Sequence, residues 1–490
     1  RLPAALIALL ILFHTVANLI WLSQDGRTLY GDPGNHARVS LEIFDILRQP
    51  TLALPAQVFD STSFWPPLPY LVSQPLYFLF GIATDVTVFT TTIFLAIAIA
   101  CTYLLGRRLY GVAAGLTAAF MFSFYPIVFL LARTYYVDIA LTALIAVTFF
   151  FLLRSEGFSM RRHALLFGVC LGLSALTKQA AAVFALGPVL AAVVAALLAN
   201  GKVGWRELAA WRPGQPLAPH GADLARRLIN MLLAALVAAL VAAPWYVANV
   251  DVLKWQTSFF NTMAENQFGA RPYWWYFAKL DDVLLLWPLL LFVVGLVIAL
   301  RRPKRHWLPL VWFVSGSLIL PLITRDLVRY MLPLMPAVAL LSAQWIGDLR
   351  RVSLRRVLLV ITALFQVTTF FLMSWGAPGA WGQALRVPVQ NDFHPLASNT
   401  TNRPQALDPL AFIYYQYPPS PHRWPVQSIL NTLYSDIEQD GRTDEFSRLV
   451  PLSKILDFEF STFSYEIELA RRLGHAGARQ VKVDDVSLQP

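Results

Sequence analysis

Ionisable side chains interrupt an otherwise apolar chain at four places, and their types suit proton transfer and phosphate binding. The groups are Asp32 with His36 and Arg38, Arg133 with Asp138, Lys178 by itself, and Arg325 with Arg329. A carboxylate can act as a general base, and arginine binds phosphate through a planar fork of donors. Because ionisable groups that flank apolar spans must face a polar cavity or one another, the sequence predicts a polar site at the ends of these spans.

The Asp32 group has a structural and a functional interpretation. Gly31-Asp32-Pro33-Gly34 is a typical β-turn sequence, because Asp, Pro and Gly suit successive positions of such a turn. If a helix begins near Gly34, its positive end favours an ionised Asp32. A carboxylate beside a site for an anionic lipid is then a candidate general base. The residues by themselves leave both interpretations open.

The other three groups are similarly ambiguous. Asp138 stands where a carboxylate often caps a helix, and Lys178 could snorkel to a membrane interface. Arg325 could pair with the aspartate that follows it, whereas Arg329 has no evident partner nearby in the sequence. Together, Arg133, Lys178 and Arg329 could form a phosphate site at a membrane surface.

The composition is that of a membrane protein. Of the 490 residues, 57% are hydrophobic and only 14% are charged, whereas soluble domains carry about 25% charged residues. The net charge of +10 does not indicate nucleic-acid binding, because the positive residues are spread over short loops. Cys101 and Cys170 both lie in apolar stretches, and the metal-binding motifs CxxC and HExxH are absent from the sequence. We therefore expect no metal and no cofactor.

Eleven apolar stretches approach the roughly 20 residues that a helix needs to cross a bilayer. They are residues 2–22, 83–105, 111–132, 136–153, 164–177, 180–199, 228–248, 282–300, 307–323, 328–346 and 357–375. We interpret the first as an uncleaved span rather than a signal peptide. The prediction is an all-α polytopic membrane domain over residues 1–375, followed by a soluble domain over residues 376–490.

Every second loop between these stretches is basic. The basic loops contain Arg107 and Arg108, Arg161 and Arg162, Lys202 and Arg206, Arg301 and Arg305, and Arg350 and Arg356. Short loops rich in Lys and Arg stay in the cytoplasm. This pattern predicts a multi-pass protein of the plasma or inner membrane with its N-terminus inside. The four ionisable groups and residues 376–490 would then lie outside.

Two outside segments of the membrane domain are long. Residues 23–82 contain an amphipathic stretch, 37–47, and an apolar run, 66–80, that is short for a span. We expect both to form helices at the membrane interface, because a crossing at 66–80 would reverse every later loop. Residues 249–281 are rich in aromatic side chains, which suit the headgroup region.

Residues 376–490 are polar and predict a mixed α/β domain outside the membrane. Helical patterns occur near 426–437 and 464–473. The strand-like run 480–483 has no evident partner, which suggests a domain that continues past the end of this chain.

The order of the motifs in residues 1–375 carries a family resemblance. The motifs are Asp32, Pro66-Pro67-Leu68, Asp138, Leu176-Thr177-Lys178, Ala243-Pro244-Trp245-Tyr246, and Arg329-Tyr330 followed by Pro333 and Pro336. This order resembles the membrane-integral glycosyltransferases of the GT-C fold. The most similar group is family 39, which includes protein O-mannosyltransferases and the aminoarabinose transferases of lipid A.

The resemblance implies a reaction and roles for single residues. Such enzymes transfer a sugar from a polyprenyl-phosphate carrier to an acceptor on the outer side, usually with inversion. Asp32 takes the place of the catalytic aspartate of the first loop, and Asp138 that of the second acidic residue. Lys178 and Arg329 fall where basic residues face the lipid phosphate. The sequence departs from the family pattern at Pro33, where the family often has Glu, and at Trp65, where it often has Lys or His.

Other functions stay open at this point. The first loop, with Asp32, His36 and Arg38, also resembles that of oligosaccharyltransferases, but Trp274-Trp275 is followed by Tyr rather than Asp. A lipid or sugar transporter would carry polar or broken helices at the bilayer midplane, whereas here the ionisable residues stand at span ends. A non-catalytic membrane scaffold would not need a set of acids and bases on one side. We therefore expect a glycosyltransferase with membrane lipid and a lipid-linked donor as partners.

Overall fold

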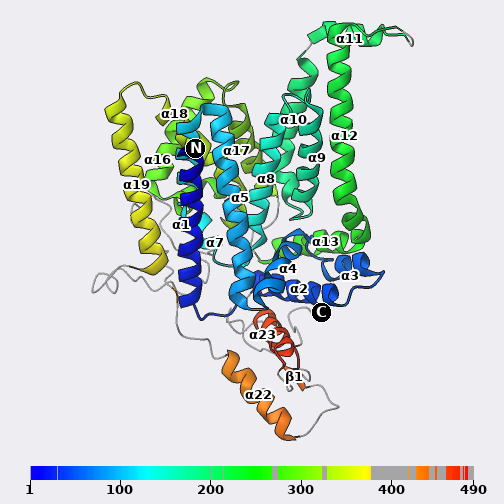
Figure 1. The fold of residues 1–490 in the computed structure, drawn as a ribbon, viewed down its shortest axis with the longest axis vertical. Coiled ribbons are helices and arrows are strands. Elements are labelled where there is room, and N and C mark those ends of the chain that lie inside the picture. Colours follow the sequence, from blue (N-terminus) through cyan, green and yellow to red (C-terminus); the bar gives the residue numbers. More distant parts are fainter. Residues whose placement is uncertain are drawn as a thin grey trace.

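The computed structural model describes most of the membrane domain and parts of the remainder. The described residues are 2–29, 31–199, 201–212, 215–267, 274–322, 328–376, 419, 426–440, 447–449, 460–474, 478 and 481–483. Figure 1 shows a bundle of roughly parallel helices, with smaller helices at one end and the C-terminal elements beyond them.

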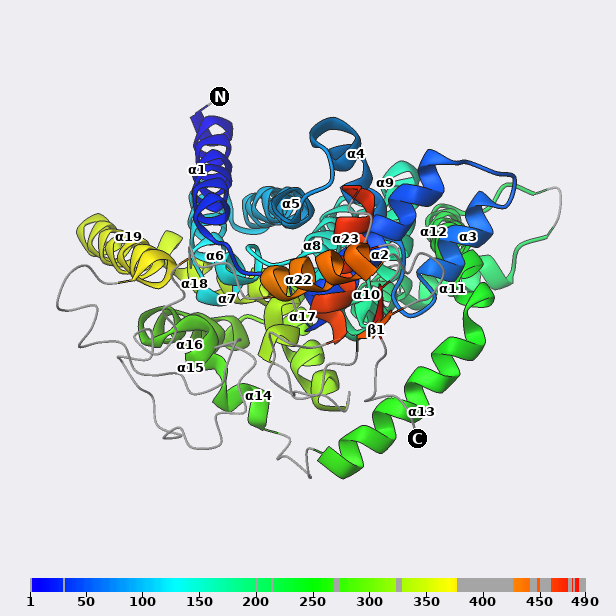
Figure 2. The same cartoon turned by 90° about the horizontal axis from the view of Figure 1, so that it is seen from below.

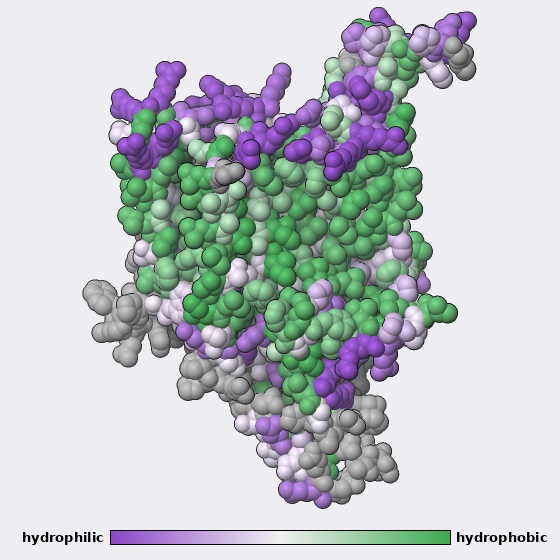
Figure 3. All heavy atoms as spheres, in the orientation of Figure 1, coloured by the Kyte–Doolittle hydropathy of each residue, from purple (hydrophilic) through white to green (hydrophobic). Residues whose placement is uncertain are grey.

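Seven apolar segments among the described residues are long enough to cross a membrane. They are α1 (Leu2–Gln24), α5 (Thr84–Tyr110), α8 (Val137–Arg154), α10 (Ala181–Leu198), α12 (Pro219–Ala248), Val328–Gly347, which comprises η2 (Val328–Leu334) and α18 (Met335–Gly347), and α19 (Val352–Trp375). On the face shown in Figure 3, a hydrophobic band lies between two polar zones. The prediction of a polytopic α-helical membrane protein is therefore confirmed.

The remaining predicted spans are shorter helices. They are α6 (Val112–Ser123) with α7 (Pro126–Leu131), α9 (Arg161–Ala175), α16 (Leu286–Arg301), and α17 (Trp307–Ile319) with η1 (Leu320–Leu322). Tyr125 is extended and Pro126 opens α7, so the stretch predicted as one span at 111–132 is broken near its end.

The helices of the bundle approach closely where glycine faces a neighbouring backbone. A Cβ atom at Gly168 of α9 would lie 2.3 Å from the carbonyl oxygen of Ala234 in α12. At Gly295 of α16 it would lie 1.9 Å from the carbonyl oxygen of Leu341 in α18. Small residues allow this proximity, which matters because packing rather than hydrophobicity holds helices together within lipid.

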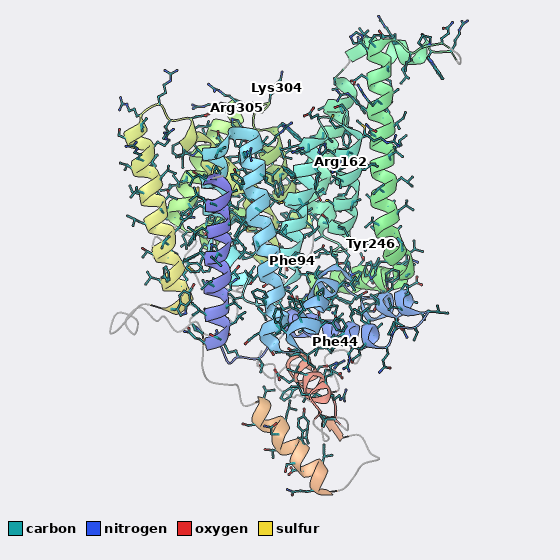
Figure 4. The ribbon with its side chains drawn as sticks, viewed as in Figure 1. Phe44, Phe94, Arg162, Tyr246, Lys304 and Arg305 are labelled. Carbon is teal, nitrogen blue, oxygen red and sulfur yellow. The ribbon has the colours of Figure 1, made fainter. Side chains whose placement is uncertain are left out.

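Small helices gather at the end of the bundle opposite the basic loops. They are α2 (Gly31–Arg48), α3 (Leu54–Ser61), α4 (Leu68–Phe80), α13 (Val250–Gln267), α14 (Trp275–Ala278) and α15 (Leu280–Leu284) (Figures 1 and 2). In Figure 4, Phe44 and Tyr246 mark this end, and Arg162, Lys304 and Arg305 mark the other. The run 66–80 does not cross the bundle, as predicted. The helix α11 (Gly201–Ala209) lies at the basic end (Figure 1).

The start of α2 differs from the expected local structure. Residues 31–34 form the first helical turn rather than a β-turn, so the helix begins at Gly31 and not near Gly34. The positive φ of Gly31 (59°) lets the chain reverse direction there, and Pro33 fits a first turn because its missing N–H needs no partner. Asp32 thus lies at the positive end of α2, where a negative charge is favoured.

The C-terminal elements contact the small helices through one helix, which packs against α2. They are α22 (Val426–Asp440), β1 (Ser447–Leu449), α23 (Phe460–Arg472) and β2 (Val481–Val483). The helices cover both stretches predicted as helical. The run at 480–483 does have a partner, because β2 pairs in parallel with β1. Arg472 forms a 2.6 Å ion pair with Asp45 of α2, and the Tyr465 hydroxyl lies 3.0 Å from that of Thr84.

Candidate active site

A cavity of about 510 Å³ lies where the small helices meet the bundle. Its polar lining consists mainly of Asp32, His36, Asp138, Lys178, Gln179 and Gln256. Its apolar lining includes Leu141, Val183, Phe184, Leu253, Leu320 and Leu322. Residues from α2, α8, the α9–α10 turn and α13 therefore enclose one cavity that has both charged and apolar lining residues. Tyr246, labelled in Figure 4 at this end of α12, also lines it.

Asp32 forms an ion pair with Arg329 across the site. These residues are 297 positions apart in the sequence, and the Arg329 side chain is only 8% exposed whereas that of Asp32 is 30% exposed. The guanidinium lies 4.3 Å from the ring centre of Tyr136 and 5.5 Å from that of Tyr330. Aromatic faces stabilise a buried cation, so Arg329 is held by a carboxylate and two rings.

Asp138 and Lys178 form a second ion pair, 2.7 Å between Nζ and Oδ1. Asp138 stands in the first turn of α8 and is 2% exposed, and Lys178 stands in the turn between α9 and α10. The other carboxylate oxygen, Oδ2, is buried without a hydrogen bond from any described residue. The Lys178 amine also lies 4.5 Å from the ring centre of Tyr330. Tyr330 thus contacts both cations of the site.

His36 projects from α2 one helical turn after Asp32. Its Nδ1 atom lies 2.7 Å from the Tyr70 hydroxyl, and its ring meets that of Trp65 edge to face at 4.5 Å. Burial lowers the pKa of His36 to about 4, so the imidazole is neutral at neutral pH. His36 therefore adds a polar but uncharged surface to the cavity.

A hydrogen-bonded loop closes one side of the cavity. The Phe64 carbonyl accepts hydrogen bonds from the side-chain amides of Gln179 (3.0 Å) and Gln256 (2.8 Å). The Trp245 indole donates to the Thr62 hydroxyl at 3.1 Å. Neither glutamine is identifiable as a site residue from the sequence, because a single Gln in a loop or helix forms no pattern that indicates a site.

Among the described residues singled out from the sequence, the cavity lining does not include Arg133, Arg38 or Arg329, although Arg329 pairs with the lining residue Asp32. Arg133 is buried on another side of the bundle, where it donates to Asn18 (3.0 Å) and to Ser374 (2.8 Å). Arg38 pairs with Glu42 along α2. Arg325 lies outside the described residues. The structure therefore brings together Asp32, His36, Asp138, Lys178 and Arg329, and it separates Arg133 and Arg38 from them.

In the described part of the chain, no group of three His, Cys, Asp or Glu side chains is arranged so that it could bind a metal ion. The two acids of the site contact the side chains of Lys178 and Arg329.

Comparisons with known proteins match both the sequence and the fold. The family model for dolichyl-phosphate-mannose-protein mannosyltransferase matches residues 65–211, which include Asp138 and Lys178. No curated protein matches the chain in sequence.

Solved structures match over nearly the whole chain. ArnT from Cupriavidus metallidurans bound to undecaprenyl phosphate superposes with a TM-score of 0.58 at 16% identity, covering 97% of this chain and 86% of that one. The Archaeoglobus fulgidus oligosaccharyltransferase in its apo form gives a TM-score of 0.55 at 11% identity, covering 99% of this chain and 65% of that one. The class is thus defined: the chain is an integral membrane protein with the GT-C fold of glycosyltransferases, as its motif order predicted.

Proposed function

We propose that the chain transfers a sugar from a polyprenyl-phosphate carrier to an acceptor, with inversion at the anomeric carbon. The observation that carries this proposal is the cavity, whose lining combines Asp32, Asp138 and Lys178 with apolar side chains, while Arg329 pairs with Asp32. A lipid phosphate with an isoprenoid chain needs both kinds of surface. The ligands of similar structures, undecaprenyl phosphate in ArnT and dolichol-phosphate in the archaeal oligosaccharyltransferase AglB, support the same assignment.

The donor phosphate binds at Lys178 and Arg329. Each cation is paired with a carboxylate, so neither charge is left uncompensated. A phosphate that enters between them offers its own oxygens to both donors and draws Arg329 away from Asp32. Binding of the donor therefore frees the Asp32 carboxylate at the moment when it is needed.

Asp32 acts as the general base. An acceptor hydroxyl attacks the anomeric carbon on the face opposite the phosphate, and its proton passes to the Asp32 carboxylate. The bond between the anomeric carbon and the phosphate oxygen breaks, and its electron pair leaves with the polyprenyl phosphate. Lys178 and Arg329 stabilise the charge that develops on that oxygen. Asp138 orients the Lys178 amine through the 2.7 Å ion pair.

The small helices and the C-terminal elements lie on the outer side of the membrane in this proposal. They occupy the end opposite Arg162, Lys304 and Arg305 (Figure 4), and basic loops stay in the cytoplasm. The acceptor then reaches the cavity from outside. The membrane domain extends over residues 1–375, and residues 376–490 form a separate soluble domain.

Turnover of a panel of polyprenyl-phosphate sugars by the purified protein tests the proposal. We expect release of polyprenyl phosphate that depends on an acceptor drawn from peptides, glycans or lipids. Asp32→Asn should lower the rate about 100-fold or more while donor binding persists, because loss of a general base costs that much. Release to an Asn-containing peptide would instead favour an oligosaccharyltransferase.

Two results would contradict the proposal. Absence of turnover with every donor and acceptor would argue against a glycosyltransferase, and movement of an intact donor across vesicles would indicate a transporter. If Asp32→Asn keeps activity within a few-fold of the wild type, Asp32 serves only the start of α2.

A further inference from the structure

We propose that Trp65 is the platform on which the ring of the donor sugar stacks, and that this contact selects the sugar. The inference rests on the proposed function, because it assigns the part of the cavity next to the phosphate site. Trp65 lines the cavity and is only partly buried, so its indole is available to a ligand.

The position of Trp65 relative to Lys178 follows from one hydrogen bond. Gln179 comes directly after Lys178, and its side chain donates to the carbonyl of Phe64, which comes directly before Trp65, at 3.0 Å. The proposed phosphate ligand and the indole thus stand on adjoining chain segments of one cavity. In the donor, the sugar is bonded directly to the phosphate, so it must lie close to that ligand and within reach of Trp65.

Neighbouring groups of the chain hold the indole in place. Its ring meets His36 at 4.5 Å and Phe64 at 4.3 Å, in both cases edge to face. Pro66 and Pro67 restrict the backbone that follows it, and the Leu68 amide donates to the Leu176 carbonyl at 3.0 Å. A prearranged ring loses little conformational freedom on binding, which raises the affinity that a contact provides.

The chemistry of this surface fits a sugar ring better than a lipid or an ion. A pyranose has polar hydroxyls at its rim and C–H groups on its faces, and an aromatic face packs against such C–H groups. The neighbouring groups Gln256, His36 and Tyr246 offer hydrogen-bonding atoms to the rim. Pockets of this kind combine an apolar surface with a few polar groups that fix orientation.

Binding measurements with two ligands test the assignment. We compare the purified wild type with Trp65→Ala and Trp65→Phe, and with Trp255→Ala as a matched control. Trp255 is half exposed on α13 and does not line the cavity. The ligands are a polyprenyl-phosphate sugar that the wild type turns over and the same polyprenyl phosphate without a sugar.

We expect Trp65→Ala to weaken binding of the sugar-carrying donor by about five- to ten-fold, which is the range for one aromatic contact. Binding of the sugar-free lipid should not change. Trp65→Phe should recover part of the loss, and its preference among donor sugars should differ from that of the wild type. Trp255→Ala should behave as the wild type with both ligands.

Equal weakening with both ligands would mean that Trp65 shapes the cavity without touching the sugar, and unchanged binding of the donor would place the sugar elsewhere. Either result overturns this inference but leaves the proposed function intact. Absence of binding or turnover for every lipid-linked sugar by the wild type would instead contradict the proposed function itself.

Discussion

At the scale of single residues, the site is arranged as two ion pairs that share an aromatic neighbour. Burying a charge is costly unless it is paired, and here each cation has a carboxylate at hand. Tyr330 lies within 5.5 Å of the Arg329 guanidinium and 4.5 Å of the Lys178 amine. In such a pair, the cation can exchange its carboxylate partner for another anion. This property suits a site that binds and releases a phosphate.

At this scale, we predict how substitution of the two cations, Lys178 and Arg329, changes donor binding. Hydrogen bonds to charged groups contribute about 1.5–3 kcal/mol each, so Lys178→Ala or Arg329→Ala should weaken donor binding by about one to two orders of magnitude. Arg329→Lys should recover only part of the loss, because a point charge does not replace a fork of donors. Donor affinity of folded protein, measured by titration, checks this.

The control is Arg38→Ala, which removes a cation from α2 without touching the cavity lining. Its donor affinity should equal that of the wild type. If both alanine variants at Lys178 and Arg329 bind donor normally, the phosphate occupies another position and the mechanism proposed for Asp32 loses its basis.

At the scale of elements, close helix packing positions the segments that carry the site. The apolar helix α18 continues directly from η2, which holds Arg329 and Tyr330, and α16 packs against it. Gly295 permits this contact, since its Cα faces the backbone of Leu341. Packing of this kind is a property of pairs of helices that neither helix has in isolation.

Gly295→Ala should lower the thermal unfolding temperature in detergent. The added methyl group would lie 1.9 Å from a backbone oxygen, so α16 and α18 must separate, and overpacking typically costs about 1–3 kcal/mol. Gly347→Ala is the matched control, because the nearest atom to its new methyl group lies at 3.8 Å. Equal unfolding temperatures for the wild type and Gly295→Ala would show that these helices do not approach so closely.

At the scale of the whole molecule, charge separates the two ends of the bundle. Arg162, Lys304 and Arg305 lie at one end, and the cavity with the C-terminal elements lies at the other (Figures 1 and 4). A hydrophobic band joins them (Figure 3). This arrangement gives the protein a fixed orientation, because basic loops resist transfer across the membrane.

Cysteine labelling in sealed cells tests that orientation. The buried Cys101 and Cys170 are first replaced by alanine, and single cysteines are then placed at the exposed positions Leu52, Ser435 and Lys304. We expect a thiol reagent that cannot cross membranes to label positions 52 and 435 in intact cells. Position 304 should react only after the cells are permeabilised. Labelling of position 304 in intact cells would contradict the predicted topology.

The sequence by itself determined the membrane class and the approximate positions of most long apolar helices, and its loop charges predicted an orientation. Hydropathy and loop charge are local properties, so they can be read without knowing any contact between distant residues. The same holds for Asp32, Asp138, Lys178 and Arg329 as candidates, because an ionisable residue at the end of an apolar span stands out within a few residues of sequence.

The tertiary structure decided which of these residues meet. Lys178 and Asp138 are 40 positions apart and Arg329 and Asp32 are 297 apart, so both pairs depend on how helices pack. Arg133 is only five residues from Asp138, yet the turn before α8 directs it towards Asn18 and Ser374, away from the cavity. Proximity along the chain does not fix the direction of a side chain, and for that physical reason the composition of the site emerged only from the fold.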